Sequence, residues 1–212
     1  MKADNKIVFM DGQYPAIMFP VGRPDEGGSC EFMTGHCRKY CPARSTNPHE
    51  QRAFDFFQKN LAFVIADKII VELSELSMLH LYWWSWGDCT SDLTEKVLRV
   101  MDRLFEAGTV QNGFTRNFEL FRRLWLGKHG PRLRIGYHTE TPEEAVRLSQ
   151  DAFPSVTCCP DVEIGKGVIY KTGRVEAKCC GTWCEWMHPN GSSEFRMADC
   201  HECFLNRRGC FA

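Results

Sequence analysis

Twelve cysteines in a chain of 212 residues are the side chains best suited to chemistry in this sequence. Three of them form the motif Cys30-x6-Cys37-x3-Cys41. Three more, Cys89, Cys158 and Cys159, lie in the middle of the chain. Thiolates are the ligands that zinc and iron–sulfur clusters prefer in proteins. A second, denser group occupies the last 34 residues: Cys179, Cys180, Cys184, Cys200, Cys203 and Cys210.

The rest of the chain disfavours a disulfide scaffold. Disulfide-rich secreted domains are usually short chains that lack a core, whereas this chain is 43% hydrophobic and long enough to bury one. Residues 1–11 contain no apolar run of the kind a secretory signal needs, and no segment approaches the roughly 20 apolar residues of a membrane span. We therefore expect reduced thiols in a cytoplasm and no membrane partner.

The first cysteine motif has the spacing of a cluster-binding loop. Three thiolates on one loop can hold three irons of a [4Fe–4S] cluster and leave the fourth iron for an outside ligand. Zinc is an alternative, because Cys₃His sites exist and His36 precedes Cys37. Three ordinary buried cysteines are the remaining interpretation. A Gly-containing loop with three cysteines in twelve residues favours a metal.

The C-terminal cysteines admit two interpretations. The pairs Cys180-x3-Cys184 and Cys200-x2-Cys203 have the spacing of a zinc ribbon, which leaves Cys179 and Cys210 without a role. So many thiolates favour iron and sulfide instead, and hence two or more clusters, while the ligating member of each adjacent pair stays open. The predicted ligands are Cys30, Cys37, Cys41, Cys159, Cys179, Cys180, Cys184, Cys200, Cys203 and Cys210.

Charge gives no indication of a nucleic-acid partner. The formal net charge is −1, so no basic field surrounds the chain. About half of the basic residues between Arg116 and Arg134 lie where the solvated face of a helix would place them. We expect a redox partner that the sequence does not identify.

The elements that would position these cysteines alternate between strand and helix. Three-and-four spacing of apolar residues predicts one helix over His49–Glu75, and the apolar run Met78–Trp86 predicts a strand covered on both faces. Further strands are predicted at Val110–Phe114, Arg132–Tyr137 and Ser155–Cys158. The intervening helices are predicted at Ser91–Ala107 with Ser91 as N-cap, at 117–127 with Asn117 as N-cap, and at Pro142–Ala152.

This alternation predicts an α/β fold with a parallel sheet. The units are too few for an eight-stranded barrel, so we expect a partial, open β/α barrel of about four to six strands. A Cys-rich N-terminal loop precedes it, and the two together form a predicted domain over residues 1–160. Residues 161–212 form a predicted Cys-rich extension, with a hairpin turned at Thr172-Gly173 followed by coil.

The first motif resembles the opening of the phage gene product 88 family. Three further features of that family occur in the same order. Ser85-Trp-Gly-Asp88 is similar to its Ser-Gly-Asp strand end, and Phe114-Thr-Arg116 matches its Phe-Thr-Arg segment. A Cys-x2-Cys near the C-terminus is present as Cys200-His-Glu-Cys203, so the resemblance covers most of the chain.

The resemblance implies an iron–sulfur protein of viral origin, working in the cytoplasm of a host cell. It also implies a partial barrel similar to that of radical S-adenosylmethionine enzymes, which makes such an enzyme of unknown substrate the first alternative function. Those enzymes mostly carry a Cys-x3-Cys-x2-Cys loop and a Gly-Gly-Glu strand end, where this chain has Cys-x6-Cys-x3-Cys and Gly87-Asp88. A structural zinc protein is the second alternative.

Two charged residues at predicted strand ends are candidate cofactor ligands. Asp88 could bind an ammonium group or a substrate hydroxyl, or it could bind the N–H groups of the helix that follows. Arg116 could neutralise a cluster or a carboxylate, or it could form an ordinary salt bridge.

Overall fold

The computed structural model divides the chain into two compact units, Met1–Met33 with Pro42–Ile135 and Thr34–Cys41 with Gly136–Ala212. No helix among the described residues is long and apolar enough to cross a membrane. The structure describes residues 6–11, 14–40, 48–84, 86–127, 132–139, 144, 147–148, 158–160, 168–172, 175–179, 183–187 and 198–199.

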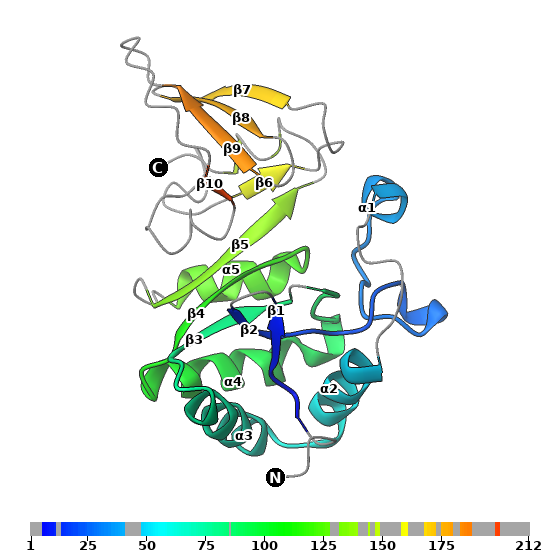
Figure 1. The fold of residues 1–212 in the computed structure, drawn as a ribbon. Coiled ribbons are helices and arrows are strands. Elements are labelled where there is room, and N and C mark those ends of the chain that lie inside the picture. The colour runs from blue at the N-terminus through cyan, green and yellow to red at the C-terminus, as the bar shows by residue number, and fades with distance from the viewer. Residues whose placement is uncertain are drawn as a thin grey trace. The chain divides into compact units, whose positions relative to one another are not determined.

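The first unit contains an open, mostly parallel sheet with the strand order β1-β2-β3-β4-β5 (Figure 1). Strand β1 pairs with β2 in the antiparallel sense, and β2-β3 and β3-β4 are parallel pairs. The strands are β1 (Phe9–Asp11), β2 (Tyr14–Ile17), β3 (His80–Trp83), β4 (Val110–Thr115) and β5 (Leu133–Thr139), of which β5 continues into the second unit.

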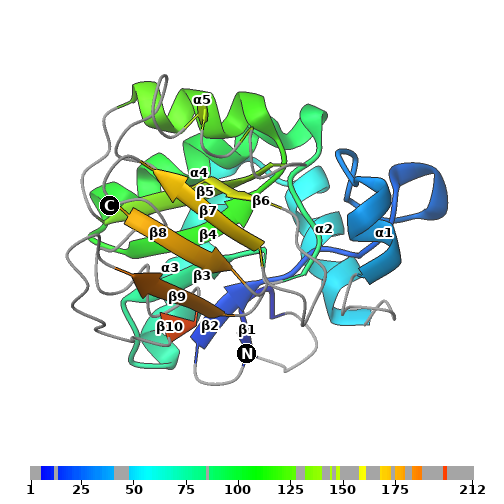
Figure 2. The same cartoon turned by 90° about the horizontal axis from the view of Figure 1, so that it is seen from above.

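Helices connect the parallel strands and pack beside one another in chain order (Figure 2). The side-by-side arrangement includes two ion pairs, Arg103–Asp67 at 2.9 Å and Arg123–Glu95 at 2.6 Å, both of them exposed. The helices of the first unit are α2 (Pro48–Lys59), α3 (Ala62–Glu75), α4 (Thr94–Glu106) and α5 (Phe118–Leu126), with short 3₁₀ turns η2 (Pro24–Glu26) and η3 (Ser91–Leu93).

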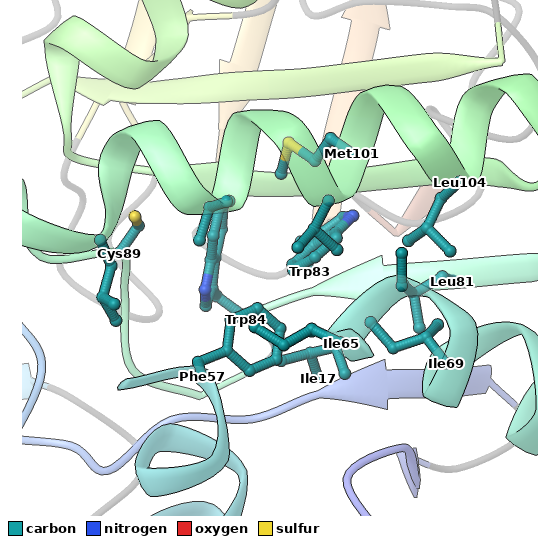
Figure 3. Close-up of a cluster of buried hydrophobic side chains, with 14 of the residues drawn as sticks. Ile17, Phe57, Ile65, Ile69, Leu81, Trp83, Trp84, Cys89, Met101 and Leu104 are labelled. Atoms are coloured by element: carbon teal, nitrogen blue, oxygen red, sulfur yellow. The ribbon is translucent and has the colours of Figure 1, made fainter. Parts of the chain in front are cut away.

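The core lies between the sheet and these helices. Leu81 and Trp83 of β3 are fully buried against apolar side chains of α3 and α4, which include Ile69 and Met101 (Figure 3). The indole N–H of Trp83 donates to Gln111 Oε1 at 3.0 Å, and Gln111 donates in turn to the Met101 carbonyl at 2.9 Å. Burial therefore leaves these polar groups paired, as a stable core requires.

Trp84 breaks the alternation of the strand. Its φ of 54° is left-handed, a conformation that costs a bulky residue on the order of 1–3 kcal/mol. Trp83 and Trp84 consequently enter the same core, with their ring centroids 5.3 Å apart. The indole Nε1 of Trp84 is buried and has no hydrogen-bond partner among the described residues.

The second unit contains strands from the C-terminal part of the chain and the short helix α1 (Gly35–Tyr40). Strand β6 (Cys158–Pro160) pairs in parallel with the end of β5 in the register Tyr137↔Cys158. A separate antiparallel sheet has the order β10-β9-β8-β7, built from β7 (Val168–Thr172), β8 (Val175–Cys179), β9 (Trp183–Met187) and β10 (Ala198–Asp199).

The predicted fold class is confirmed at the level of an open, mostly parallel α/β sheet. The predicted single helix over His49–Glu75 is wrong, because Asn60 and Leu61 divide it into α2 and α3. Leu61 is extended (φ −75°, ψ 152°), and the Asn60 side chain donates to the Phe56 carbonyl at the end of α2. Apolar periodicity does not register such a break, since the spacing resumes after it.

Two other local predictions are corrected. The N-terminal segment, expected to be loop, contains β1 and β2, which are short strands, and β2 includes Pro15. The C-terminal tail is not coil throughout, because β9 and β10 follow the predicted hairpin.

Strand β3 is not covered equally on its two faces: His80 and Tyr82 are only half-buried. The predicted helix over 142–152 lies mostly outside the described residues. The domain boundary at residue 160 stays a prediction.

Glu72 anchors the N-terminal segment to α3. Its carboxylate is 1% exposed and accepts the backbone N–H groups of Ile7 at 3.0 Å and Val8 at 2.7 Å. Lys68 forms an ion pair with the same carboxylate at 2.8 Å. We expect Glu72→Ala to lower the free energy of unfolding by about 3 kcal/mol, because it leaves two buried N–H groups unpaired and removes the ion-pair partner of Lys68.

Urea unfolding measures this loss, and Glu75→Ala serves as the control because Glu75 is exposed on the same helix. Amide hydrogen exchange at Ile7 and Val8 should accelerate in the Glu72 variant only. Equal stability of the two variants would show that the carboxylate does not anchor the segment.

Candidate functional site

The carboxyl ends of β2 and β3 meet at one edge of the sheet because the two strands are parallel. Ligands of open α/β sheets bind outside this edge. The segment that carries Cys30 leaves β2 here, and the segment that carries Asp88 leaves β3. The candidate site is therefore built from residues 18–33, 84, 86–90 and 115–117.

The Asp88 carboxylate joins the ends of two strands. Its Oδ1 accepts the Thr115 hydroxyl at 2.6 Å and the Cys89 N–H at 2.7 Å. Its Oδ2 accepts the N–H of Arg116 at 2.7 Å. Cys89 lies in the loop after β3, whereas Thr115 and Arg116 lie at the end of β4. The carboxylate therefore joins the ends of the two strands.

Burial sets the charge of this group. Asp88 is 6% exposed, and the loss of solvation raises its pKa from an ordinary 3.8 to about 6. The hydrogen bonds from Thr115, Arg116 and Cys89, and the positive charge of Arg116, oppose this rise in pKa. At neutral pH the carboxylate is ionised and its charge is held by the donors around it.

Gly87 allows the chain to turn into this position. Its φ is +76°, and a Cβ atom there would lie 2.4 Å from the Phe19 carbonyl oxygen and 2.7 Å from Ser29 Oγ. Only a residue without a side chain permits this approach. The loop after β3 is thereby pressed against the segment that leads to Cys30.

Arg116 and Asn117 follow β4. Arg116 is half-buried, and its backbone N–H reaches the Asp88 carboxylate. Asn117 is the N-cap of α5, as predicted, because its side chain accepts the N–H of Leu120 at 3.0 Å. The Asn117 amide also donates to the Cys89 carbonyl at 3.2 Å and to Thr94 Oγ1 at 2.7 Å.

The segment around Cys30 is held by neighbours on both sides. Ser29 Oγ donates to the Pro20 carbonyl at 2.9 Å and accepts the N–H of Asp88 at 3.1 Å. Glu31 accepts the N–H of Ser91 at 2.6 Å and its hydroxyl at 2.9 Å. The start of η3, which leads into α4, is therefore capped by Glu31, and the prediction that the Ser91 side chain is the N-cap is wrong.

Only Cys30 and Cys37 among the predicted ligands have described side chains. Both are partly exposed and in no disulfide. Cys37 lies in α1, and its N–H donates to Thr34 Oγ1 at 3.0 Å. Among the side chains that the structure describes, no three His, Cys, Asp or Glu residues gather as a metal site.

For the other predicted ligands the structure describes either the backbone alone or neither backbone nor side chain. Cys159 lies in β6, Cys179 in β8 and Cys184 in β9, and Cys179 and Cys184 are register partners. The remaining five lie outside the described residues: Cys41, Cys180, Cys200, Cys203 and Cys210. The ligand set thus stays a prediction.

Cys89 has the environment of a core residue. It is fully buried, and its sulfur lies 3.4 Å from the Thr90 carbonyl as a donor. Burial, with the negative charge of Asp88, raises the pKa of the Cys89 thiol well above its ordinary value. In this environment the thiol keeps its proton at neutral pH.

The face of the sheet opposite to Leu81 and Trp83 carries a second set of polar residues. Tyr82 and Asn112 are register partners on β3 and β4, and His80 precedes them on the same face of β3. Burial lowers the pKa of His80, and the neighbouring Asn112 side chain opposes this shift. His80 is therefore neutral at physiological pH.

Sequence reasoning missed three polar residues of the site: Ser29, Glu31 and Thr115. Each adjoins a residue that was singled out, namely Cys30 or Arg116. Their position next to Cys30 or Arg116 was the sequence signal that could have identified them. Only the fold shows that Ser29 and Glu31 meet partners about 60 residues away along the chain, at Asp88 and Ser91.

Comparison of the chain with protein-family models, with curated proteins and with solved structures gave no significant match. The class that the structure defines is an α/β protein with an open, mostly parallel sheet. The resemblance to the phage gene product 88 family stays a prediction that rests on its motifs.

The titration of Asp88 predicts a pH-dependent stability. A raised pKa in the folded state means that folding binds the proton, so this contribution is complete below about pH 4 and is lost as the pH rises through about 6. The rise of the pKa from 3.8 to about 6 corresponds to about 3 kcal/mol. The stability of the wild type relative to Asp88→Asn should fall by about 2 kcal/mol from pH 4 to pH 6, and by nearly all of the 3 kcal/mol from about pH 3 to about pH 7.

Denaturant unfolding of both proteins across that pH range measures the difference between their free energies of unfolding. The contributions of the other titrating groups are the same in both proteins and cancel in this difference. A difference that stays constant with pH would mean that Asp88 has the same pKa in the folded and unfolded chains.

The close approach at Gly87 predicts a position-specific loss. Gly87→Ala and Gly27→Ala both place a side chain at a positive φ, +76° and +82°, but nothing lies within 4 Å of a Cβ atom at Gly27. Gly27→Ala should cost about 1 kcal/mol from the backbone alone, and Gly87→Ala at least about 2 kcal/mol. Thermal unfolding compares them, and equal losses would remove the steric argument.

Proposed function

We propose that this chain is an iron–sulfur protein that carries two or more clusters, of the [4Fe–4S] type, and serves redox chemistry. Cys30, Cys37 and Cys41 would bind one cluster, and the C-terminal cysteines with Cys159 would bind the others. The bound clusters supply one-electron transfer. The motifs further favour a viral source and a host cytoplasm.

The observation that carries the proposal is the placement of Cys30. Its segment leaves the carboxyl end of a parallel strand, where α/β proteins bind their ligands. Two anchors, at Ser29 and Glu31, hold the backbone on either side of it, while its thiol remains partly exposed. Cys30 is partly exposed, whereas Cys89 is fully buried, so the Cys30 side chain is accessible to a cluster bound at this edge of the sheet.

An enzyme that combines a cluster with S-adenosylmethionine is the alternative that the parallel sheet favours. Asp88 and Arg116 are the residues that would contact the cofactor. Three donors already occupy the Asp88 carboxylate, which leaves one lone pair, on Oδ2, for a further group. Formation of 5′-deoxyadenosine by the reduced protein with S-adenosylmethionine would establish this alternative, and its absence with intact clusters would favour electron transfer.

Anaerobic purification tests the proposal directly. We expect a brown protein with iron and acid-labile sulfide in similar amounts. Cys37→Ala and Cys200→Ala should each lose part of the iron, and from different clusters, because the two cysteines belong to separate motifs. Cys89→Ala is the control, since its buried thiol is not a predicted ligand, and it should keep all the iron.

A colourless protein with stoichiometric zinc would replace the proposal with a structural zinc protein. Unchanged iron in both ligand variants would overturn the ligand assignment, and loss of all iron in either would indicate a single shared assembly.

A further inference from the structure

The segment before Cys30 folds back on itself. The N–H of Ser29 donates to the Pro20 carbonyl and that of Cys30 to the Gly22 carbonyl, both at 2.8 Å. A Cβ atom on Gly28 would lie 2.0 Å from the Gly22 carbonyl oxygen, so the two arms of this turn touch through their backbones. The backbone of Cys30 has little freedom here.

The Ser29 hydroxyl fastens this turn to the sheet. The side chain is fully buried and bridges two groups, as donor to the Pro20 carbonyl and as acceptor from the Asp88 N–H. Asp88 is in turn fixed to β4 through its carboxylate. The hydroxyl is therefore the connection between the cysteine segment and the ends of β3 and β4.

Glu31 supplies the second fastening, on the other side of Cys30. Its two carboxylate oxygens accept the N–H and the hydroxyl of Ser91, where the 3₁₀ turn before α4 begins. A carboxylate at a helix start is favoured by the free N–H groups and the dipole there. Cys30 thus lies between one anchor on the sheet edge and one on a helix start.

We infer that Ser29 and Glu31 are positioning residues that fix the thiolate of Cys30 for cluster binding, with Asp88 as the fixed point behind Ser29. This inference rests on the proposed function. Neither residue need contact the cluster, because each acts through the backbone of Cys30. The Asp88 carboxylate acts on the Cys30 segment indirectly, because it fixes the loop after β3, whose Asp88 N–H donates to Ser29.

The test compares Ser29→Ala, Glu31→Ala and Glu31→Gln with the wild type, all purified anaerobically. Ser29→Ala removes the bridge and Glu31→Ala the helix-start acceptor, so each should lose iron to a chelator at least tenfold faster. Each should also alter the electron paramagnetic resonance spectrum of one reduced cluster and leave the other cluster unchanged. Glu31→Gln keeps an oxygen acceptor for the Ser91 N–H and should restore most of the wild-type behaviour.

Thr94→Val is the matched control. Thr94 is buried, and its hydroxyl is hydrogen-bonded to the Thr90 carbonyl and the Asn117 amide rather than to residues 29–31. The substitution should leave the spectrum and the rate of iron loss unchanged even if it lowers stability.

The possible outcomes separate this inference from the proposed function. A wild type without iron would refute both. The wild type could carry clusters while Ser29→Ala and Glu31→Ala match it in spectrum and in rate of iron loss. That result would refute the positioning role alone. Effects of Thr94→Val as large as theirs would also refute that role, because the change would then reflect general destabilisation.

Discussion

The buried carboxylate of Asp88 is the interaction on which the rest of the described site depends. It gathers donors from the loop after β3 and from the end of β4, and the N–H of the same residue reaches Ser29 in the segment after β2. Three consecutive parallel strands are thus joined at one edge by one residue. A carboxylate that has lost its solvation needs these donors, and the donors need it, so the arrangement is stable only when it is complete.

The core behind this edge explains why the loops can be specific. Apolar side chains of α3 and α4 bury β3 on one face, and the Trp83–Gln111–Met101 series pairs the polar atoms that remain there. Lys96 of α4 adds a capping contact, because its ammonium group donates to the Phe57 and Gln58 carbonyls at the end of α2. Rigid elements of this kind hold loop geometry to the tolerance that a ligand site requires.

Much of the central fold could be predicted from the sequence, because it depends on local patterns. A continuous apolar run indicated β3, the alternation of strand and helix indicated β4, and Asn117 indicated the start of α5. The break at Asn60-Leu61 and the short strand β2 could not be predicted, since each depends on packing that apolar spacing does not encode. The site was predicted only in part: Asp88 was identified by its place after a strand, but its partner Ser29 is a contact across 59 residues.

Two glycines limit how this edge of the sheet can change in evolution. A Cβ atom on Gly113 would lie 2.4 Å from the Trp83 carbonyl oxygen, and one on Gly87 would lie equally near that of Phe19. Neighbouring chain segments approach at these points more closely than any side chain allows. Sequences that share this architecture should therefore retain both glycines even where the cysteines have diverged, which makes the pair a marker of the fold that is independent of metal binding.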